Sequence, residues 1–556
     1  MAITPNTNIR LLKLPITIDN KNQLTFASKE AQTEYFLSLT HLEIENCTYQ
    51  RKDNIIRYPA HIDSILEYNY CIYQNENYTN KWFYAFIINM KYINDNMTEI
   101  KIETDYFQTW QFDLIYKQSF IEREMLSVSD DVVGANLIPE GLETGEFKID
   151  NSSELDDLEP VTVIAYSGEK IRHPGDDVYP IYRDISQAGF YINGIPSTVP
   201  FILTTSGQET NRLIGFLSLE NNSDFVVASF TVPKLAVKDF MIQANSLMAN
   251  GSDTGIYVLY ANTLDTSFTQ TPITKNFVSL PTSIDGYTPR NQKLRTYPYI
   301  YLGFNAQNGS NKIYRYEDFE NLTPIFKVIS EVNPNPTICF IPQNYRGNTG
   351  DNIADSVIMN GYPTISTRTD TFNIWLAQNG NIIDLQMQQE EFNYALNQVS
   401  NITGGISNSV QGNVGGLLEN ATNMLQNGVN HEFYIKNQMA QIEKQKMLPD
   451  KVNLGSSATL LGYDLIKKDI FVRYSIKRQF AEKIDKYFDM YGYLTNNRKV
   501  PNINNRPNWN YIKTIGANIE GNIPQFDLQN IKVMFDNGVT LWHNPNTFLD
   551  YSQNNR

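Results

Sequence analysis

The strongest constraint in this sequence is a long segment that carries almost no charge and has helical apolar spacing. No charged residue occurs between Glu391 and Glu419, and none occurs from 421 to 430. Apolar residues recur there mostly every three, four or seven positions, which is typical of one face of an α-helix. Charged residues return on both sides. The sequence therefore predicts a helical hairpin over 385–447, with two charged stems and an uncharged, glycine-rich tip.

We predict that the apolar face of this tip is the functional surface of the chain. It comprises Val399, Ile402, Ile406, Val410, Val414, Leu417, Leu418, Met424 and Leu425. Glycines offer backbone freedom at the joints of such a hairpin. The predicted hinges are Gly404, Gly405, Gly412, Gly415, Gly416 and Gly428.

The tip allows two interpretations. In the first, the hairpin is exposed and packs on another subunit. In the second, it enters a membrane conditionally, because each arm of about 18 residues would span roughly 27 Å as a helix, close to the ~30 Å of membrane hydrocarbon. Many asparagines make a single hairpin too polar to insert stably. Insertion would therefore need a ring of hairpins whose polar faces line a wet lumen.

Most of the remaining sequence predicts short strands. Residues 55–58, 68–73, 98–104 and 119–124 are β-rich, and 81–90 is so apolar that we expect a strand buried on both faces. Asp105 is a candidate N-cap for a short helix that reaches residue 112. Near the other end we expect strands at 469–476, 511–515, 517–520 and 539–543, and helices around 480–488 and 525–535.

These elements predict an α+β fold that is mainly β, divided into several domains. Both ends of the chain combine strands with short aromatic helices, which suggests two related modules. The expected domains are 1–128, a β-rich insertion at 129–370, the hairpin region at 371–454, and 455–556. Because 130–180 is acidic and rich in turn residues, we interpret it as a boundary or an exposed loop system.

The charge balance limits the function classes. Lys and Arg number 45 and Asp and Glu 60, which gives a formal net charge of −15. A protein that grips DNA by neutralising its phosphates needs the opposite balance. An acidic wall would instead let DNA slide past, although a role of the charge in solubility alone is the more common explanation.

Motifs for common chemistry are missing from the sequence. It contains no P-loop, no HExxH and no GxSxG, and its five histidines and three cysteines are scattered. We therefore expect no cofactor, no metal site and no enzymatic activity, although a pair of carboxylates for glycoside hydrolysis leaves no motif to search for. Asp176–Asp177 and Gly350–Asn352 could bind Ca²⁺, but solvated turns explain them better. No signal peptide or ordinary transmembrane helix is expected.

Three blocks resemble a known family. They are 81–86, then 103–113 with 119–124, and finally 535–543, which reads Phe-Asp-Asn-Gly-Val-Thr-Leu-Trp-His. The first two resemble the N-terminal region of the tail knob (distal tube) proteins of small short-tailed phages with protein-primed DNA replication. The third resembles the C-terminal signature of that family, and the hairpin lies where the family carries its pore-forming loop.

The resemblance implies a virion structural protein of the tail tip, synthesised in the host cytoplasm. It implies a homohexameric tube subunit that contacts the proximal tail or lower collar protein and lets genomic DNA pass without sequence-specific binding. The loops would plug the lumen and conditionally permeabilise the host cytoplasmic membrane. Two alternatives remain at this stage, a tail-tip cell-wall hydrolase and a receptor-binding tail protein.

Overall fold

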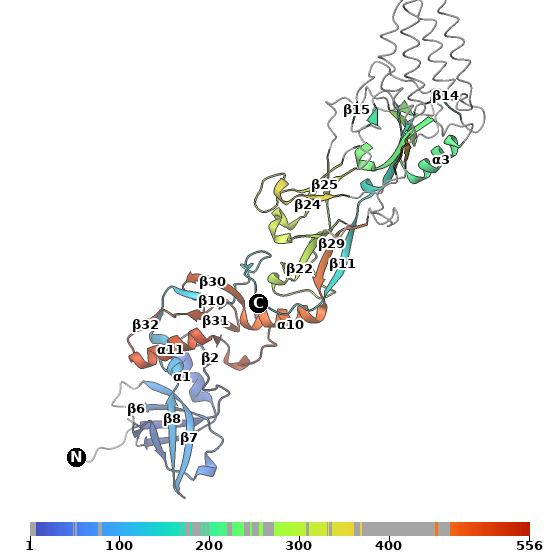
Figure 1. Ribbon diagram of the computed structural model, residues 1–556. Coiled ribbons are helices and arrows are strands. Elements are labelled where there is room, and N and C mark those ends of the chain that lie inside the picture. Colours follow the sequence, from blue (N-terminus) through green and yellow to red (C-terminus); the bar gives the residue numbers. More distant parts are fainter. Residues whose placement is uncertain are drawn as a thin grey trace, which may run out of the picture. The chain divides into compact units, whose positions relative to one another are not determined.

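A computed structural model describes most of the chain in two compact units (Figure 1). Unit 1 comprises Met1–Lys148, Pro281–Ile300 and Ser475–Arg556, and unit 2 comprises Ile149–Leu280 and Tyr301–Tyr474. The described residues are 7–47, 49–50, 53–75, 81–166, 168, 170–172, 178–180, 191–192, 195–196, 200–218, 225–237, 245–246, 255–259, 272–306, 311–330, 332, 336–360, 367–369, 451–453 and 468–556.

Unit 1 contains a small β-barrel built from the first quarter of the chain. Its strands are β1 (Thr7–Leu12), β3 (His41–Cys47), β4 (Tyr49–Gln50), β5 (Ile55–Tyr58), β6 (Tyr70–Asn75), β7 (Trp82–Asn94) and β8 (Met97–Thr104). They are ordered β3-β1-β6-β7-β8-β5-β4, and all pairs are antiparallel. Only one residue separates β3, at one end of this order, from β4, at the other. The sheet therefore closes on itself through residues 41–50.

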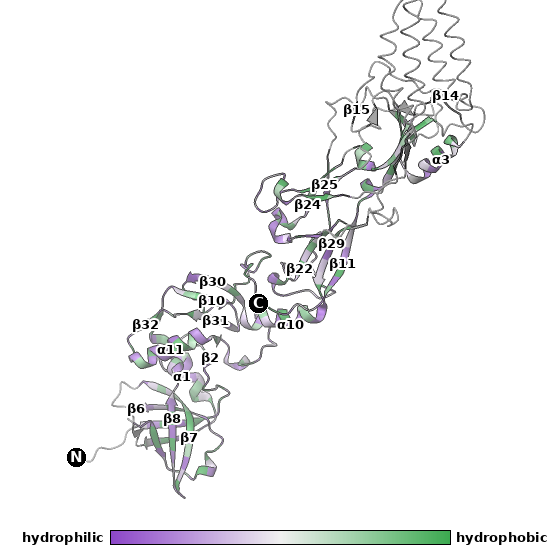
Figure 2. Ribbon diagram, viewed as in Figure 1, coloured by the Kyte–Doolittle hydropathy of each residue, from purple (hydrophilic) through white to green (hydrophobic). Residues whose placement is uncertain are grey.

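Side chains fill the inside of this barrel. Strand residues alternate between the two faces of a sheet, so every second residue points inward. Hydrophobic and hydrophilic residues accordingly share the same strands in Figure 2. The buried interior comprises Ile9, Leu11, Cys47, Ile56, Tyr58, Ile65, Cys71, Tyr73, Phe83, Ala85, Ile100 and Ile102. The barrel is a packed core rather than a channel.

Strand β7 differs from the sequence expectation over its second half. Phe83 to Phe86 are buried, as a strand covered on both faces should be. Beyond them, Ile88, Tyr92 and Ile93 are 41–47% exposed. The reason is the length of the neighbouring strand, because β6 pairs only with residues 82–86 of β7. The prediction of burial on both faces is therefore wrong past Phe86.

The second part of unit 1 combines segments from both ends of the chain. Its main sheet has the order β2 (Asn22–Leu24), β33 (Val539–Trp542), β31 (Trp509–Ile515), β10 (Ser119–Glu124) and β30 (Tyr493–Lys499). A separate ladder pairs β9 (Leu114–Tyr116) with β32 (Ile519–Gly521). The helices are α1 (Lys29–Ser38), α2 (Tyr106–Trp110), α10 (Arg478–Tyr491) and α11 (Gln525–Asn537). Ile531, Met534 and Phe535 of α11 pack against Ile512 and Leu541 of the sheet.

Unit 2 is built from several small sheets. One has the order β11 (Phe147–Glu154), β29 (Lys468–Ile476), β22 (Ile300–Asn305) and β23 (Asn311–Tyr314). The first residues of β11 and β22 and the last residues of β29 are counted in unit 1. The next is β21 (Ile273–Asn276), β24 (Ile325–Ser330), β25 (Ile338–Pro342) and β26 (Val357–Met359). A third is β18 (Val226–Pro233), β12 (Pro160–Tyr166), β17 (Phe201–Thr204), β20 (Ile256–Leu259) and β19 (Asn245–Ser246), beside α3 (Gly207–Leu217).

Short elements complete the described chain. Two-stranded ladders join β13 (Lys170–Arg172) to β14 (Val178–Pro180), β15 (Tyr191–Ile192) to β16 (Ile195–Pro196), and β27 (Thr367–Thr369) to β28 (Lys451–Asn453). The 3₁₀ turns are η1 (Ile62–Ser64), η2 (Gln111–Asp113), η3 (Asp156–Leu158), η7 (Gln292–Arg295), η8 (Tyr316–Asp318), η9 (Glu320–Leu322), η10 (Ile353–Asp355) and η11 (Pro545–Thr547).

The fold class expected from the sequence is confirmed. The described residues form many short sheets with a few helices, and the strands predicted near 55, 70, 98, 119, 470, 511 and 540 are present. So are the helices predicted from Asp105, near 480–488 and at 525–535. None of the helices within the described residues has both the length and the apolar character needed to cross a bilayer.

Candidate functional site

The predicted functional surface lies outside the described residues. This holds for the apolar positions Val399, Ile402, Ile406, Val410, Val414, Leu417, Leu418, Met424 and Leu425, and for the hinges Gly404, Gly405, Gly412, Gly415, Gly416 and Gly428. The structure does describe the sequence blocks that carry the family resemblance, 81–86, 103–113 with 119–124, and 535–543. They lie in unit 1, and they hold that unit together through buried polar contacts.

The second block, 103–113 with 119–124, contains a buried carboxylate, that of Asp105. Asp105 precedes α2 and accepts a hydrogen bond from the Gln108 backbone N–H at 3.1 Å, which caps the helix as the sequence predicts. Its second oxygen accepts a hydrogen bond from the Tyr70 hydroxyl at 3.0 Å. The side chain is fully buried, and this burial raises the pKa of Asp105 to about 6.

A buried ionic triad lies beside β10. The Glu140 carboxylate, which is completely buried, pairs with Arg123 of β10 and with Lys293 of η7. The Leu494 backbone N–H also donates to Glu140, at 2.9 Å. Burial lowers the pKa of Lys293, and Glu140 opposes that effect. The triad joins three separate parts of the chain. Because the three side chains are buried, loss of any one of them would leave an uncompensated charge inside the protein.

A third buried carboxylate fixes the segment Pro281–Ile300 to the rest of unit 1. Asp485 of α10 is fully buried and accepts hydrogen bonds from the Tyr287 hydroxyl at 2.6 Å and the Arg290 backbone N–H at 2.8 Å. The backbone N–H and the side-chain amide of Asn291 donate to the other oxygen of Asp485, at 2.9 and 2.8 Å. Four donors around one carboxylate hold this segment against α10.

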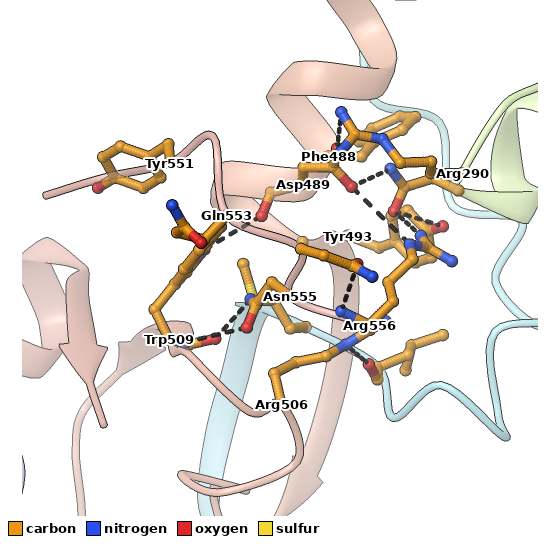
Figure 3. Close-up of a pocket in the computed structure, with 15 residues that line it drawn as sticks. Arg290, Phe488, Asp489, Tyr493, Arg506, Trp509, Tyr551, Gln553, Asn555 and Arg556 are labelled. Atoms are coloured by element: carbon orange, nitrogen blue, oxygen red, sulfur yellow. Dashed lines mark hydrogen bonds and ion pairs between the residues drawn. The ribbon is translucent and has the colours of Figure 1, made fainter. Parts of the chain in front are cut away.

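The last residues of the sequence complete this arrangement (Figure 3). Asn555 accepts hydrogen bonds from the backbone N–H groups of Asn508 and Trp509, at 2.8 and 3.0 Å. The Arg556 guanidinium pairs with Asp131 at 2.9 Å and donates to Asn291 at 2.6 Å. We call Asp131, Asn291, Asp485, Asp489 and Arg556 the polar clamp.

Three residues of the polar clamp, Asn291, Asp489 and Arg556, line a small cavity of about 20 Å³. Its lining includes Arg290, Asp489, Trp509 and Arg556 (Figure 3). A space of this size holds about one water molecule. Asp489 is paired with Arg290 at 2.7 Å, and burial raises the pKa of Asp489. The charged groups around this cavity pair with one another, and the clamp thereby connects separate segments of unit 1.

The structure decides between the two sequence interpretations of the acidic stretch 130–180. A boundary between the two units does lie there, at Lys148 and Ile149. The stretch is not an exposed loop system throughout, because the side chains of Asp131 and Glu140 are 1% and 0% exposed. Strands β11 and β12 also lie in this stretch. An acidic residue is easily taken for a solvated one when its partner is distant in the sequence. Here Asp131 pairs with Arg556, and Glu140 pairs with Lys293. The burial of Asp131 and Glu140 therefore leaves no local sequence signal.

The suggested Ca²⁺ position at Gly350–Asn352 has other partners. Asp351 pairs with Lys327 at 2.8 Å, and the Asn352 side chain caps η10 by accepting from the Asp355 N–H at 3.2 Å. Asp355 in turn pairs with Lys312 and Arg346. Within the described parts of the chain, no group of three or more metal-ligating side chains occurs. Asp176–Asp177 lies outside those parts.

Comparison with known proteins identifies the family. A family model described as the C-terminal domain of tail knob protein gp9 of Bacillus phage phi29 matches residues 261–556, more than half of the chain. The chain belongs to this tail knob family. A second model, described as the N-terminus of caudoviral major tail proteins, matches residues 5–116, which include the closed barrel.

Relatives along the full length agree with this assignment. The chain is 25% identical to tail knob protein gp9 of Bacillus phage phi29, with 98% of each chain covered. It is 24% identical to tail knob protein gp9 of Bacillus phage B103, with 100% of each covered. The solved tail knob protein gp12 of bacteriophage C1 has the same fold, with a TM-score of 0.61, 14% identity and 98% coverage of both chains. The chain is therefore a structural component of a phage tail.

Proposed function

We propose that the chain is the subunit of the distal tail tube that conducts DNA during genome ejection. Copies of the chain, six by the resemblance, would form a ring next to the proximal tail protein. The segment 385–447 would plug the lumen before infection and permeabilise the host cytoplasmic membrane afterwards. Membership of the tail knob family supports the proposal that the chain is a tube subunit. The role of segment 385–447 is a further part of our proposal.

The observation that carries the gating role is the absence of charge between Glu391 and Glu419. In a chain of net charge −15, such a span avoids the cost of desolvating charge when it packs in a lumen or meets lipid. The domain borders proposed above place this span in 371–454, between the β-rich insertion and the C-terminal module. Changes to it should therefore leave the tube modules intact.

Dye release from liposomes tests the proposal. A variant that lacks residues 400–430 should still form rings in negative-stain images but should release no dye. A finer variant replaces Ile402, Ile406 and Val410 by serine, and its matched control replaces Asn401, Asn408 and Asn413 by serine. The proposal predicts loss of leakage in the first and retention in the second. Unchanged leakage after the deletion would refute the membrane role.

Two further assays separate the alternatives. A tail-tip hydrolase would clear peptidoglycan in a zymogram, whereas the tube proposal predicts no clearing. A receptor-binding protein would block phage adsorption when added in excess to host cells. The tube proposal predicts rings with a central density that disappears in the deletion variant, which neither alternative explains.

A further inference from the structure

The guanidinium of Arg556 has one nitrogen that the polar clamp leaves unmatched. Both terminal nitrogens have partners, since Nη1 pairs with Asp131 at 2.9 Å and Nη2 donates to Asn291 at 2.6 Å. The third nitrogen, Nε, is buried and has no hydrogen-bond acceptor among the described residues. Burying a donor without an acceptor costs free energy, so folded proteins rarely leave one unmatched. The Nε–H group therefore requires an explanation.

Asp489 brings an unmatched acceptor to the same cavity. Its Oδ1 atom accepts a hydrogen bond from the Asn291 side chain at 2.8 Å. Its Oδ2 atom lies 2.7 Å from a guanidinium nitrogen of Arg290, but this ionic contact lacks the geometry of a hydrogen bond. Within the described parts of the chain, Oδ2 is buried and accepts no hydrogen bond. A free donor and a free acceptor thus belong to two residues that line one cavity.

The separation between Arg556 and Asp489 is too long for a direct hydrogen bond. Arg556 Nε lies 3.9 Å from Asp489 Oδ1, whereas N–H···O bonds measure about 2.7–3.2 Å. In Figure 3 the Asp489 carboxylate points toward the Arg556 guanidinium. A water molecule that accepts from one group and donates to the other joins atoms at such a separation. The polarity and the spacing of the pair are therefore those of a water bridge.

The cavity also has the size and the charge that suit water. A space of about 20 Å³ is large enough for one water molecule, which needs two to four polar partners. The arginines in the lining oppose a cation, and the Asp489 carboxylate opposes an anion. These arginines are Arg290, Arg506 and Arg556. A neutral molecule that both donates and accepts matches this mixed lining better than an ion of either sign.

We propose that one buried water molecule occupies the cavity and completes the polar clamp. It accepts a hydrogen bond from Arg556 Nε and donates one to the Asp489 carboxylate. The water thereby gives both groups the partner that the protein does not supply, and it attaches the segment around Arg556 to α10. This inference concerns the interior of unit 1 and does not depend on the tube proposal.

High-resolution maps of the full chain test the proposal. Wild type should show a density peak within about 3.2 Å of Arg556 Nε and of an Asp489 oxygen. Arg556→Lys keeps the positive charge but places a carbon where Nε was, so the peak should be lost. Arg506→Lys is the matched control, because Arg506 also lines the cavity but its Nε already donates to the Leu126 carbonyl at 2.7 Å. The peak should be retained in that control.

Crystals soaked in sodium bromide separate water from an anion. The proposal predicts no anomalous bromide signal in the cavity, and such a signal would refute it by identifying an anion site. An empty cavity in wild type, or a direct bond between Arg556 Nε and Asp489, would refute it as well. Any pattern in the variants other than loss in Arg556→Lys alone would show that Nε does not hold the molecule, and would also refute the bridge. None of these outcomes changes the tube proposal.

Discussion

The indole Nε1–H of Trp110 donates to the Asp527 carboxylate at 2.8 Å, across 417 positions of the sequence. Trp110 ends α2, and Asp527 lies in the first turn of α11. The Lys81 ammonium lies 3.6 Å from the centre of the Trp110 ring. Trp110 of the N-terminal blocks is thus hydrogen-bonded to the helix that contains the first residues of the C-terminal signature.

This bond leads to the first prediction. Trp110→Phe removes the donor and leaves Asp527 without that partner, so the free energy of unfolding should fall by about 1–3 kcal/mol. Urea denaturation measures the change. Trp82→Phe is the matched control, since Trp82 is also half-buried and loses the same ring volume. Equal losses in the two variants would mean that the bond contributes nothing.

The ionic triad gives the second prediction. Glu140→Gln leaves Arg123 and Lys293 buried without their shared counter-charge, and breaking such a group typically costs about 3–5 kcal/mol. A thermal melt of unit 1 should shift clearly downward. Glu143→Gln changes an exposed residue three positions away and should leave the melt unchanged. A Glu140→Gln protein as stable as wild type would show that the triad is dispensable.

The third prediction concerns pH. The folded-state pKa of Asp105 is raised by burial to about 6, above the ordinary value of about 3.9 for an unfolded chain. The folded state therefore binds the proton more tightly, and this stabilisation is fully present below pH 3.9 and is lost as the pH rises through 6. From pH 4 to pH 7, wild type should lose on the order of 2–3 kcal/mol relative to Asp105→Asn.

Unfolding curves of both proteins at several pH values measure this difference. Asp53→Asn, at an exposed turn, serves as the control and should follow wild type at every pH. If the difference between wild type and Asp105→Asn stays constant with pH, then Asp105 does not titrate in this range.

The fourth prediction tests the turn after α11. Gly538 has a φ of 90°, and a Cβ there would overlap the Tyr511 hydroxyl. Gly538→Ala should therefore cost about 2–5 kcal/mol, through backbone strain together with overpacking. Gly516 has a φ of 67° but open space around it, so Gly516→Ala should cost only about 1 kcal/mol. A similar loss in both variants would remove the steric argument.

Local sequence patterns predicted the elements of this fold better than its connections. Period-two alternation located β8, and the Asp105 cap located α2, because both signals lie within a few neighbouring residues. The closure of the barrel through residues 41–50 was not predicted, since it depends on pairing between distant strands. The exposed half of β7 was misjudged for the same reason, because burial there depends on where β6 ends.

The polar clamp could not be predicted from local sequence patterns either. Asp131, Asp485 and Arg556 look like surface residues, and only their spatial neighbours make them structural. The predicted lumen segment is the opposite case. Its missing charge is a strong local signal, yet its placement in the proposed ring would depend on contacts that no single stretch of sequence encodes.

The barrel and the main sheet of unit 1 can fold at different times during translation. Every strand of the barrel lies within the first 104 residues, so this part can close while the ribosome is still translating the remainder. The sheet that holds β10 must wait for β31 and β33, which are translated among the last. A truncated product would thus carry a finished barrel beside an incomplete sheet, and could not assume the complete unit 1 fold.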